Sequence, residues 1–88
     1  MKKADYSHTL VEQIRAFLNE HSDEIYSTSE MKRMFPVIFR QRDNRVIREF
    51  MGKGWCCQST ANRYWYFGAP AIIKEFVDEF PEMEYEKN

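Results

Sequence analysis

The spacing of the apolar residues changes at Gly52, and this change constrains the fold more than any other feature of the chain. Before Gly52, apolar residues recur on one face of a helix predicted over residues 43–51, with Asp43 as its cap. After it, residues 55–58 and 63–67 are apolar and aromatic runs on either side of a polar turn, which is the pattern of two strands in a hairpin. A helix followed directly by a hairpin predicts an α+β fold.

Four further segments carry the pattern of regular structure. Apolar residues at helical spacing predict a first helix around residues 10–18, and a short extended piece follows at 25–26. A second helix is predicted over residues 27–34, and Pro36 prevents its continuation. A last amphipathic helix is predicted over residues 70–80.

The two ends of the chain and one internal segment lack this pattern. Residues 1–6 are short and polar, and Pro81 precedes an acidic stretch, so 1–6 and 81–88 are expected to be flexible tails. Residues 37–39 are apolar and are expected to pack inward, in a conformation that the pattern leaves open. With no repeat and no linker, the 88 residues are predicted to form one domain.

Composition narrows the class of protein. Hydrophobic residues make up 43% of the chain and aromatic residues 16%, which is enough for one small core. Cys56 and Cys57 are adjacent, which disfavours a disulfide between them, and neither histidine lies at a zinc-ligand spacing from them. We therefore expect no metal and no other cofactor. Reduced thiols, without a signal peptide or a long apolar run, indicate a cytoplasmic protein that does not contact a membrane.

Known catalytic motifs are missing from the sequence. It has no glycine-rich phosphate loop, no nucleophile elbow, and no Cys-His or paired-carboxylate spacing that stands out. The chain is therefore predicted not to be an enzyme.

The distribution of charge is more informative than the net charge of −1. Residues 31–63 contain eight basic and two acidic residues, whereas residues 1–30 contain three and six, and residues 64–88 contain two and six. A basic middle third between acidic flanks indicates a patch for an anionic partner such as nucleic acid.

The predicted order is helix, short strand, helix, helix, hairpin, helix. In this order the sequence resembles the winged-helix superfamily over residues 9–67, with residues 70–80 as an added terminal helix. The run from Asp43 to Phe67 carries the resemblance, because a basic third helix ends in a glycine turn and a hairpin rich in aromatic residues follows. A narrower likeness is to the small winged helices of phage and plasmid replication proteins.

The resemblance implies that the third helix enters the major groove of DNA and that the hairpin, the wing, contacts the adjacent backbone or minor groove. The helical phase also places Arg45 and Arg48 together on the outward face, and arginine binds phosphate or guanine in bidentate fashion. Gln41 and Asn44 are candidate readers of adenine. The other predicted contacts, mainly to phosphate, are Lys32, Arg33, Arg40, Arg42, Lys53, Asn62 and Arg63. Duplex DNA is the expected ligand of a regulatory (transcription) or replication-accessory protein.

The aromatic strand has two interpretations. Alternation places Tyr64 and Tyr66 on one face and Trp65 and Phe67 on the other. One face is expected to fill the core, and we favour a structural role for these rings. An outward pair would instead stack on unpaired bases of single-stranded nucleic acid.

A protein-binding winged helix is the alternative function, for example a phage-type product that docks on a host protein and modulates it. The last helix has more large apolar residues than a small core is expected to absorb, so its surface is predicted to meet a partner or form a homodimer. These residues are Ile72, Ile73, Phe76, Val77 and Phe80.

Overall fold

The computed structural model describes residues 3–39 and 45–85, and for residues 3–9, 38, 45, 46 and 50 it describes the backbone only. The elements in chain order are α1 Lys3–Glu20, β1 Tyr26–Ser27, α2 Thr28–Met34, α3 Pro36–Phe39, α4 Arg45–Met51, β2 Cys56–Ser59, β3 Trp65–Phe67, α5 Pro70–Glu79 and β4 Met83–Tyr85. The predicted α+β class is confirmed.

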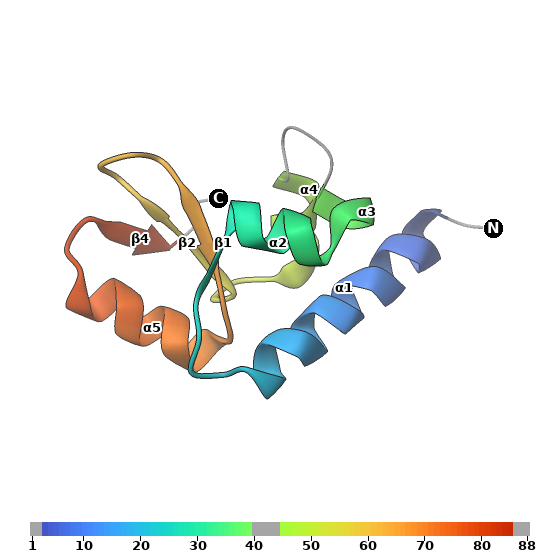
Figure 1. Cartoon of the computed structure of the whole chain (residues 1–88), viewed down its shortest axis with the longest axis horizontal. Coiled ribbons are helices and arrows are strands. Elements are labelled where there is room, and N and C mark those ends of the chain that lie inside the picture. Colours follow the sequence, from blue (N-terminus) through green and yellow to red (C-terminus); the bar gives the residue numbers. More distant parts are fainter. Residues whose placement is uncertain (1–2, 40–44, 86–88) are drawn as a thin grey trace.

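The strands form one antiparallel sheet in the order β1-β3-β2-β4 (Figure 1). Successive residues of a strand point to opposite faces, so the sheet has two sides to cover. On one side, Phe67 of β3 and Cys56 of β2 belong to the main core, together with residues of α1, α2, α3 and α4. The rings of Phe67 and Phe39 meet edge to face, with their centroids 5.4 Å apart. On the other side, the Tyr66 ring meets the ring of Phe76 on α5, with their centroids 5.8 Å apart. The sheet therefore lies between the helical core and α5.

Local sequence signals set several boundaries. Ser27 and Glu30 form a capping box at the start of α2, because the Glu30 N–H donates to Ser27 Oγ (3.2 Å) and the Ser27 N–H donates to Glu30 Oε1 (2.8 Å). Gly52 follows the last residue of α4 with φ +90°, a left-handed conformation that glycine adopts without strain. Pro36 ends α2 as predicted and is also the first residue of α3, where its missing N–H costs no hydrogen bond.

The prediction that residues 81–88 form a flexible tail is wrong for Met83–Tyr85. These residues form β4, which pairs with β2. Thr60 fixes the approach to this strand, because both its N–H (2.7 Å) and its Oγ1 (3.0 Å) donate to the Glu82 carbonyl. The unpaired edge of β2 supplies hydrogen bonds that a local reading of residues 81–88 does not reveal. At the other end, α1 begins at Lys3, within the expected tail of residues 1–6.

The proposed cap of the third helix, Asp43, lies outside the described residues, and α4 is described from Arg45. Among the residues that are described, no helix is long and apolar enough to cross a membrane.

Candidate nucleic-acid interface

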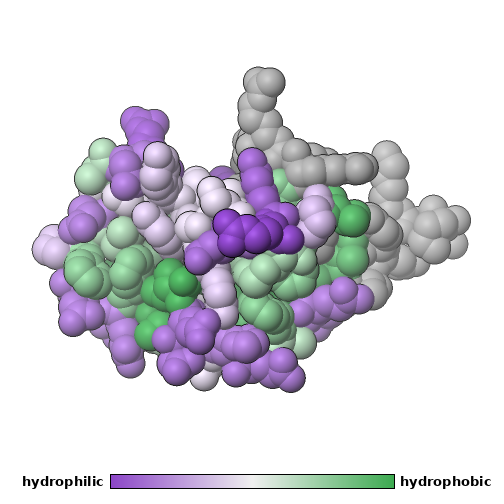
Figure 2. All heavy atoms as spheres, in the orientation of Figure 1, coloured by the Kyte–Doolittle hydropathy of each residue, from purple (hydrophilic) through white to green (hydrophobic). Residues whose placement is uncertain are grey.

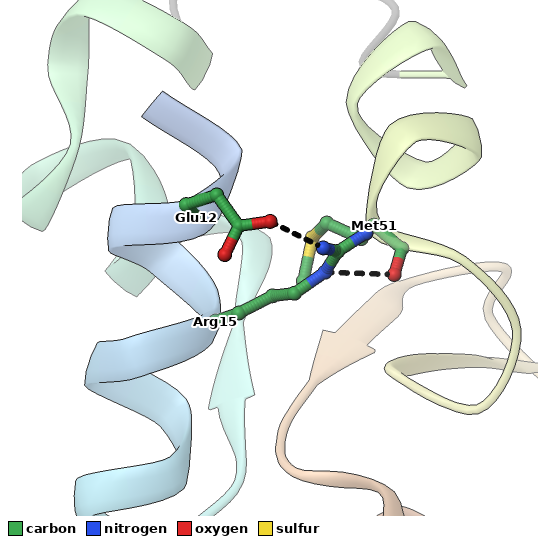
Figure 3. Close-up of polar contacts among 3 residues, drawn as sticks. All are labelled: Glu12, Arg15 and Met51. Carbon is green, nitrogen blue, oxygen red and sulfur yellow. Dashed lines mark hydrogen bonds and ion pairs between the residues drawn. The ribbon is translucent and has the colours of Figure 1, made fainter. Parts of the chain in front are cut away.

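The end of α4 is fixed to α1 by a side-chain hydrogen bond. Arg15 Nε donates to the carbonyl of Met51 at 3.2 Å, and Arg15 Nη1 donates to Glu12 Oε2 at 2.9 Å (Figure 3). The carbonyls in the last turn of a helix have no partner within the helix. A cation at this position also interacts favourably with the negative end of the helix dipole. Arg15 therefore holds the helix that the sequence predicted to read DNA.

Arg48, predicted to point outward from this helix, does not do so. Its side chain is buried, with 9% exposed, and its Cζ lies 3.9 Å from the centroid of the Trp65 ring in β3. Met51 is three residues further on and shares the same helix face, so burying Met51 in the core turns Arg48 toward the sheet. The indole face then provides a partner for the buried guanidinium. The prediction that Arg48 is an outward base reader is thus wrong in its geometry.

The other predicted contacts fall into two groups. Arg40, Gln41, Arg42 and Asn44 lie outside the described residues, and Arg45 is described by its backbone alone. The exposed residues are Lys32 and Arg33 on α2, Lys53 in the turn after α4, and Asn62 and Arg63 in the turn between β2 and β3. Hydrophilic surface covers α2 in Figure 2, and α2, α4 and the β2–β3 turn occupy the same upper side of the molecule in Figure 1.

The β2–β3 turn is ordered by its own hydrogen bonds. The buried Ser59 accepts at Oγ from the N–H groups of Ala61 (3.2 Å) and Asn62 (3.3 Å), and its carbonyl accepts from the Arg63 N–H at 2.7 Å. Asn62 Oδ1 accepts from the Tyr64 N–H at 2.9 Å. These bonds present the exposed side chains of Arg63 and Tyr64 at the end of the hairpin.

The four aromatic residues around β3 divide into three packed rings and one exposed ring. Phe67 is buried in the core, Trp65 lies under Arg48, and Tyr66 contacts α5. Tyr64 is 64% exposed. The favoured structural role is confirmed for the three packed rings. Of the outward pair in the alternative interpretation, only Tyr64 is exposed.

An acidic residue that the sequence analysis missed lies near this surface. Gln58 pairs with Trp65 on one side and with Glu84 on the other, so Glu84 shares the sheet face of Trp65. Alternation of Met83, Glu84 and Tyr85 is a strand signal that could have located this carboxylate. Together with the exposed Glu49 of α4, it limits where phosphate groups can approach.

The predicted partner surface on α5 is largely used within the molecule. Ile73 is buried, and Ile72, Phe76 and Val77 are partly buried. Phe80 remains 40% exposed at the end of the helix. Figure 2 shows the apolar surface that remains over α5. Ile73 is not part of any such surface, because it is buried, and Phe76 packs on Tyr66 of the sheet.

The two thiols do not resemble reactive cysteines. Cys56 and Cys57 are both buried and reduced, and burial raises the pKa of the Cys57 thiol from 9.0 to about 11. Over residues 3–39 and 45–85, no group of three His, Cys, Asp or Glu side chains is placed to hold a metal ion.

Comparison with known proteins gives no family assignment. No protein-family model matches the chain, and neither a curated protein nor a solved structure matches it at a significant level.

Proposed function

We propose that this protein binds nucleic acid, with duplex DNA as the main ligand, through α2, α4 and the β2–β3 hairpin acting as a wing. The observation that carries the proposal is an excess of exposed positive charge on and beside these elements. The exposed cations there are Lys32 and Arg33 on α2, Lys53 in the turn after α4, and Arg63 in the β2–β3 turn. Exposed acids are more numerous elsewhere, at Glu20 in the last turn of α1, at Asp23 and Glu24 after it, and at Glu75, Asp78 and Glu79 on α5. Two exposed acids, Glu30 on α2 and Glu49 on α4, lie among the cations.

This local excess of positive charge suits a polyanionic ligand. Phosphates of the DNA backbone are contacted mainly by Lys and Arg, and the release of condensed counterions drives such binding. Acidic flanks repel DNA elsewhere on the surface, so the binding orientation is restricted to one side. The order of elements supports a winged-helix arrangement, in which α3 and β4 are additions. The role proposed for this arrangement is regulatory or replication-accessory.

Arg48 has a different role in this proposal from the one that the sequence suggested. Its contact with Trp65 joins α4 to the wing strand β3, so it positions the two elements that meet DNA. Base contacts then fall to Arg45 and to residues 40–44, and the exposed cations contact phosphates.

The test is fluorescence anisotropy with a labelled mixed-sequence duplex, starting at about 50 mM salt and rising to about 200 mM. We expect binding that weakens with salt, and a salt slope that falls by about 1 when Arg33→Gln, Lys53→Gln or Arg63→Gln removes a phosphate contact. Lys74→Gln on α5 is the matched control, since it makes the same charge change at an exposed site outside these three elements. No binding at about 50 mM salt, or an equal effect of Lys74→Gln, would overturn the proposal.

A second candidate function is docking on a protein, either a host protein or a second copy of the chain. Phe80 at the end of α5 is 40% exposed and Tyr85 at the end of β4 is 41% exposed, so each leaves apolar side-chain surface open to solvent. A homodimer would give twice the monomer mass of 10.7 kDa by light scattering and would dissociate on Phe80→Ser. Co-purification of a stoichiometric partner that is lost on Phe80→Ser, but kept on Arg63→Gln, would favour a host protein.

A further inference from the structure

The end of the wing combines a backbone conformation that disfavours arginine with an arginine. Arg63 has φ +68°, the left-handed region in which a side chain is strained and glycine or asparagine is preferred. Its N–H donates to the Ser59 carbonyl at 2.7 Å, and its carbonyl accepts from Gln58 Nε2 at 3.1 Å. The turn itself gains nothing from an arginine here, so its side chain indicates an external role.

Tyr64, the next residue, has the largest exposed fraction among the large apolar side chains of the described residues. Its backbone is fixed on both sides, because its carbonyl accepts from the Ser59 N–H at 3.0 Å and its N–H donates to Asn62 Oδ1. A ring that is exposed on a fixed backbone loses little conformational entropy when a ligand stacks on it.

We propose that Arg63 and Tyr64 form a binding site for an unpaired nucleobase, so that the preferred ligand is DNA with a single-stranded end or gap. The Tyr64 ring stacks on the base, and the Arg63 guanidinium binds the neighbouring phosphate. Aromatic rings stack on any base, whereas inserting one into an intact duplex costs unstacking energy. An unpaired base offers the same π face without that cost. This inference rests on the proposed function, because it names the form of nucleic acid that the wing selects.

Three labelled probes separate the base from the phosphates and from the duplex. One is a duplex closed at both ends by non-nucleotide linkers, the second carries a short thymidine overhang, and the third carries an abasic overhang of equal length. Anisotropy titrations should give tighter binding to the thymidine overhang than to either of the others.

The variants assign this preference to the wing. Tyr64→Ala should weaken binding to the thymidine overhang by about 5- to 150-fold and leave the closed duplex unaffected, while Tyr64→Phe keeps the ring and the preference. Arg63→Gln should weaken binding to all three probes. Tyr85→Ala is the matched control, because it removes another exposed tyrosine outside the wing.

Circular dichroism of each variant verifies that the fold is intact. Equal binding of all three probes by the wild type, or an unchanged preference in Tyr64→Ala, would overturn the base site and leave the proposed function standing. Absence of binding to every probe at low salt would overturn both.

Discussion

The guanidinium of Arg48 lies over the ring of Trp65, with the Arg48 Cζ 3.9 Å from the ring centroid. This contact joins α4, the helix that ends before Gly52, to β3, the second strand of the hairpin. It also removes a positive charge from the surface on which the sequence placed it, so the candidate interface is narrower than the count of basic residues suggests.

The Arg48 contact should contribute to stability. Arg48→Ala is expected to lower the free energy of unfolding by about 1–2 kcal/mol, because a desolvated cation–π contact and the packing of the arginine stem are both lost. Urea unfolding followed by circular dichroism measures this change. Arg33→Ala removes an exposed arginine of α2 and should change stability by less than about 0.5 kcal/mol. Equal stabilities of the two variants would contradict a structural role for Arg48.

Arg15 should stabilise the end of α4. Arg15→Ala is expected to lower the free energy of unfolding by about 0.5–1.5 kcal/mol, since the Met51 carbonyl loses a part-buried hydrogen bond. Glu12→Gln is the comparison, because it weakens the exposed ion pair while leaving the Arg15 bond to Met51 possible, and exposed pairs contribute little. A larger loss in Glu12→Gln than in Arg15→Ala would place the stabilisation in the ion pair instead.

The capping box should set the stability of α2. Ser27→Ala is expected to lower the free energy of unfolding by about 1 kcal/mol, because the Glu30 N–H loses its side-chain acceptor. Ser29→Ala, on an exposed position of the same helix, is the matched control and should have a much smaller effect. Chemical denaturation of both variants makes the comparison, and equal losses would argue against the cap.

Cys57 should make stability sensitive to alkaline pH. The pKa of its thiol is raised by burial to about 11, so between pH 9 and pH 11 the unfolded chain releases this proton while the folded chain retains it. The contribution to stability is complete below pH 9 and is lost as the pH rises toward 11.

Urea unfolding at neutral pH and near pH 10.5 tests this expectation, with Cys57→Ala losing less stability than the wild type. The pKa of Tyr26 is also raised, to about 12, by desolvation first and then by its hydrogen bond to Glu24. That contribution is common to both proteins, so only the difference between them reports on Cys57. Parallel pH profiles would contradict the assignment.

Some of the fold could be predicted because its causes are local. The capping box of Ser27 and Glu30 and the helix stop at Gly52 depend on neighbours within a few residues, and both are found in the structure. The hairpin was predictable from alternation on both sides of a polar turn. Periodicity alone could not orient α4, because a periodicity argument gives every apolar residue of the helix equal weight. In the structure Met51 is buried in the core, and Arg48, on the same helix face, is buried with it.

The candidate site was predicted less completely than the fold. Arg63 and Lys53 are exposed as expected, but the position of Glu84 beside the wing depends on the pairing of β4 with β2. Tyr64 is exposed and Phe67 is buried because only part of this segment packs against the core. Neither relationship exists within a short stretch of chain.

The amino-acid sequence by itself determined the α+β class, the helix boundaries at Ser27 and Gly52, and the concentration of positive charge in its middle third. Each of these follows from backbone preference and side-chain chemistry at neighbouring positions. Only the tertiary structure decided that Arg48 stacks on Trp65, that α5 covers the second face of the sheet, and that an acidic strand closes its edge. The physical reason is that burial and pairing are set by segments distant in the chain, which compete for the same apolar surface and the same unpaired strand edge.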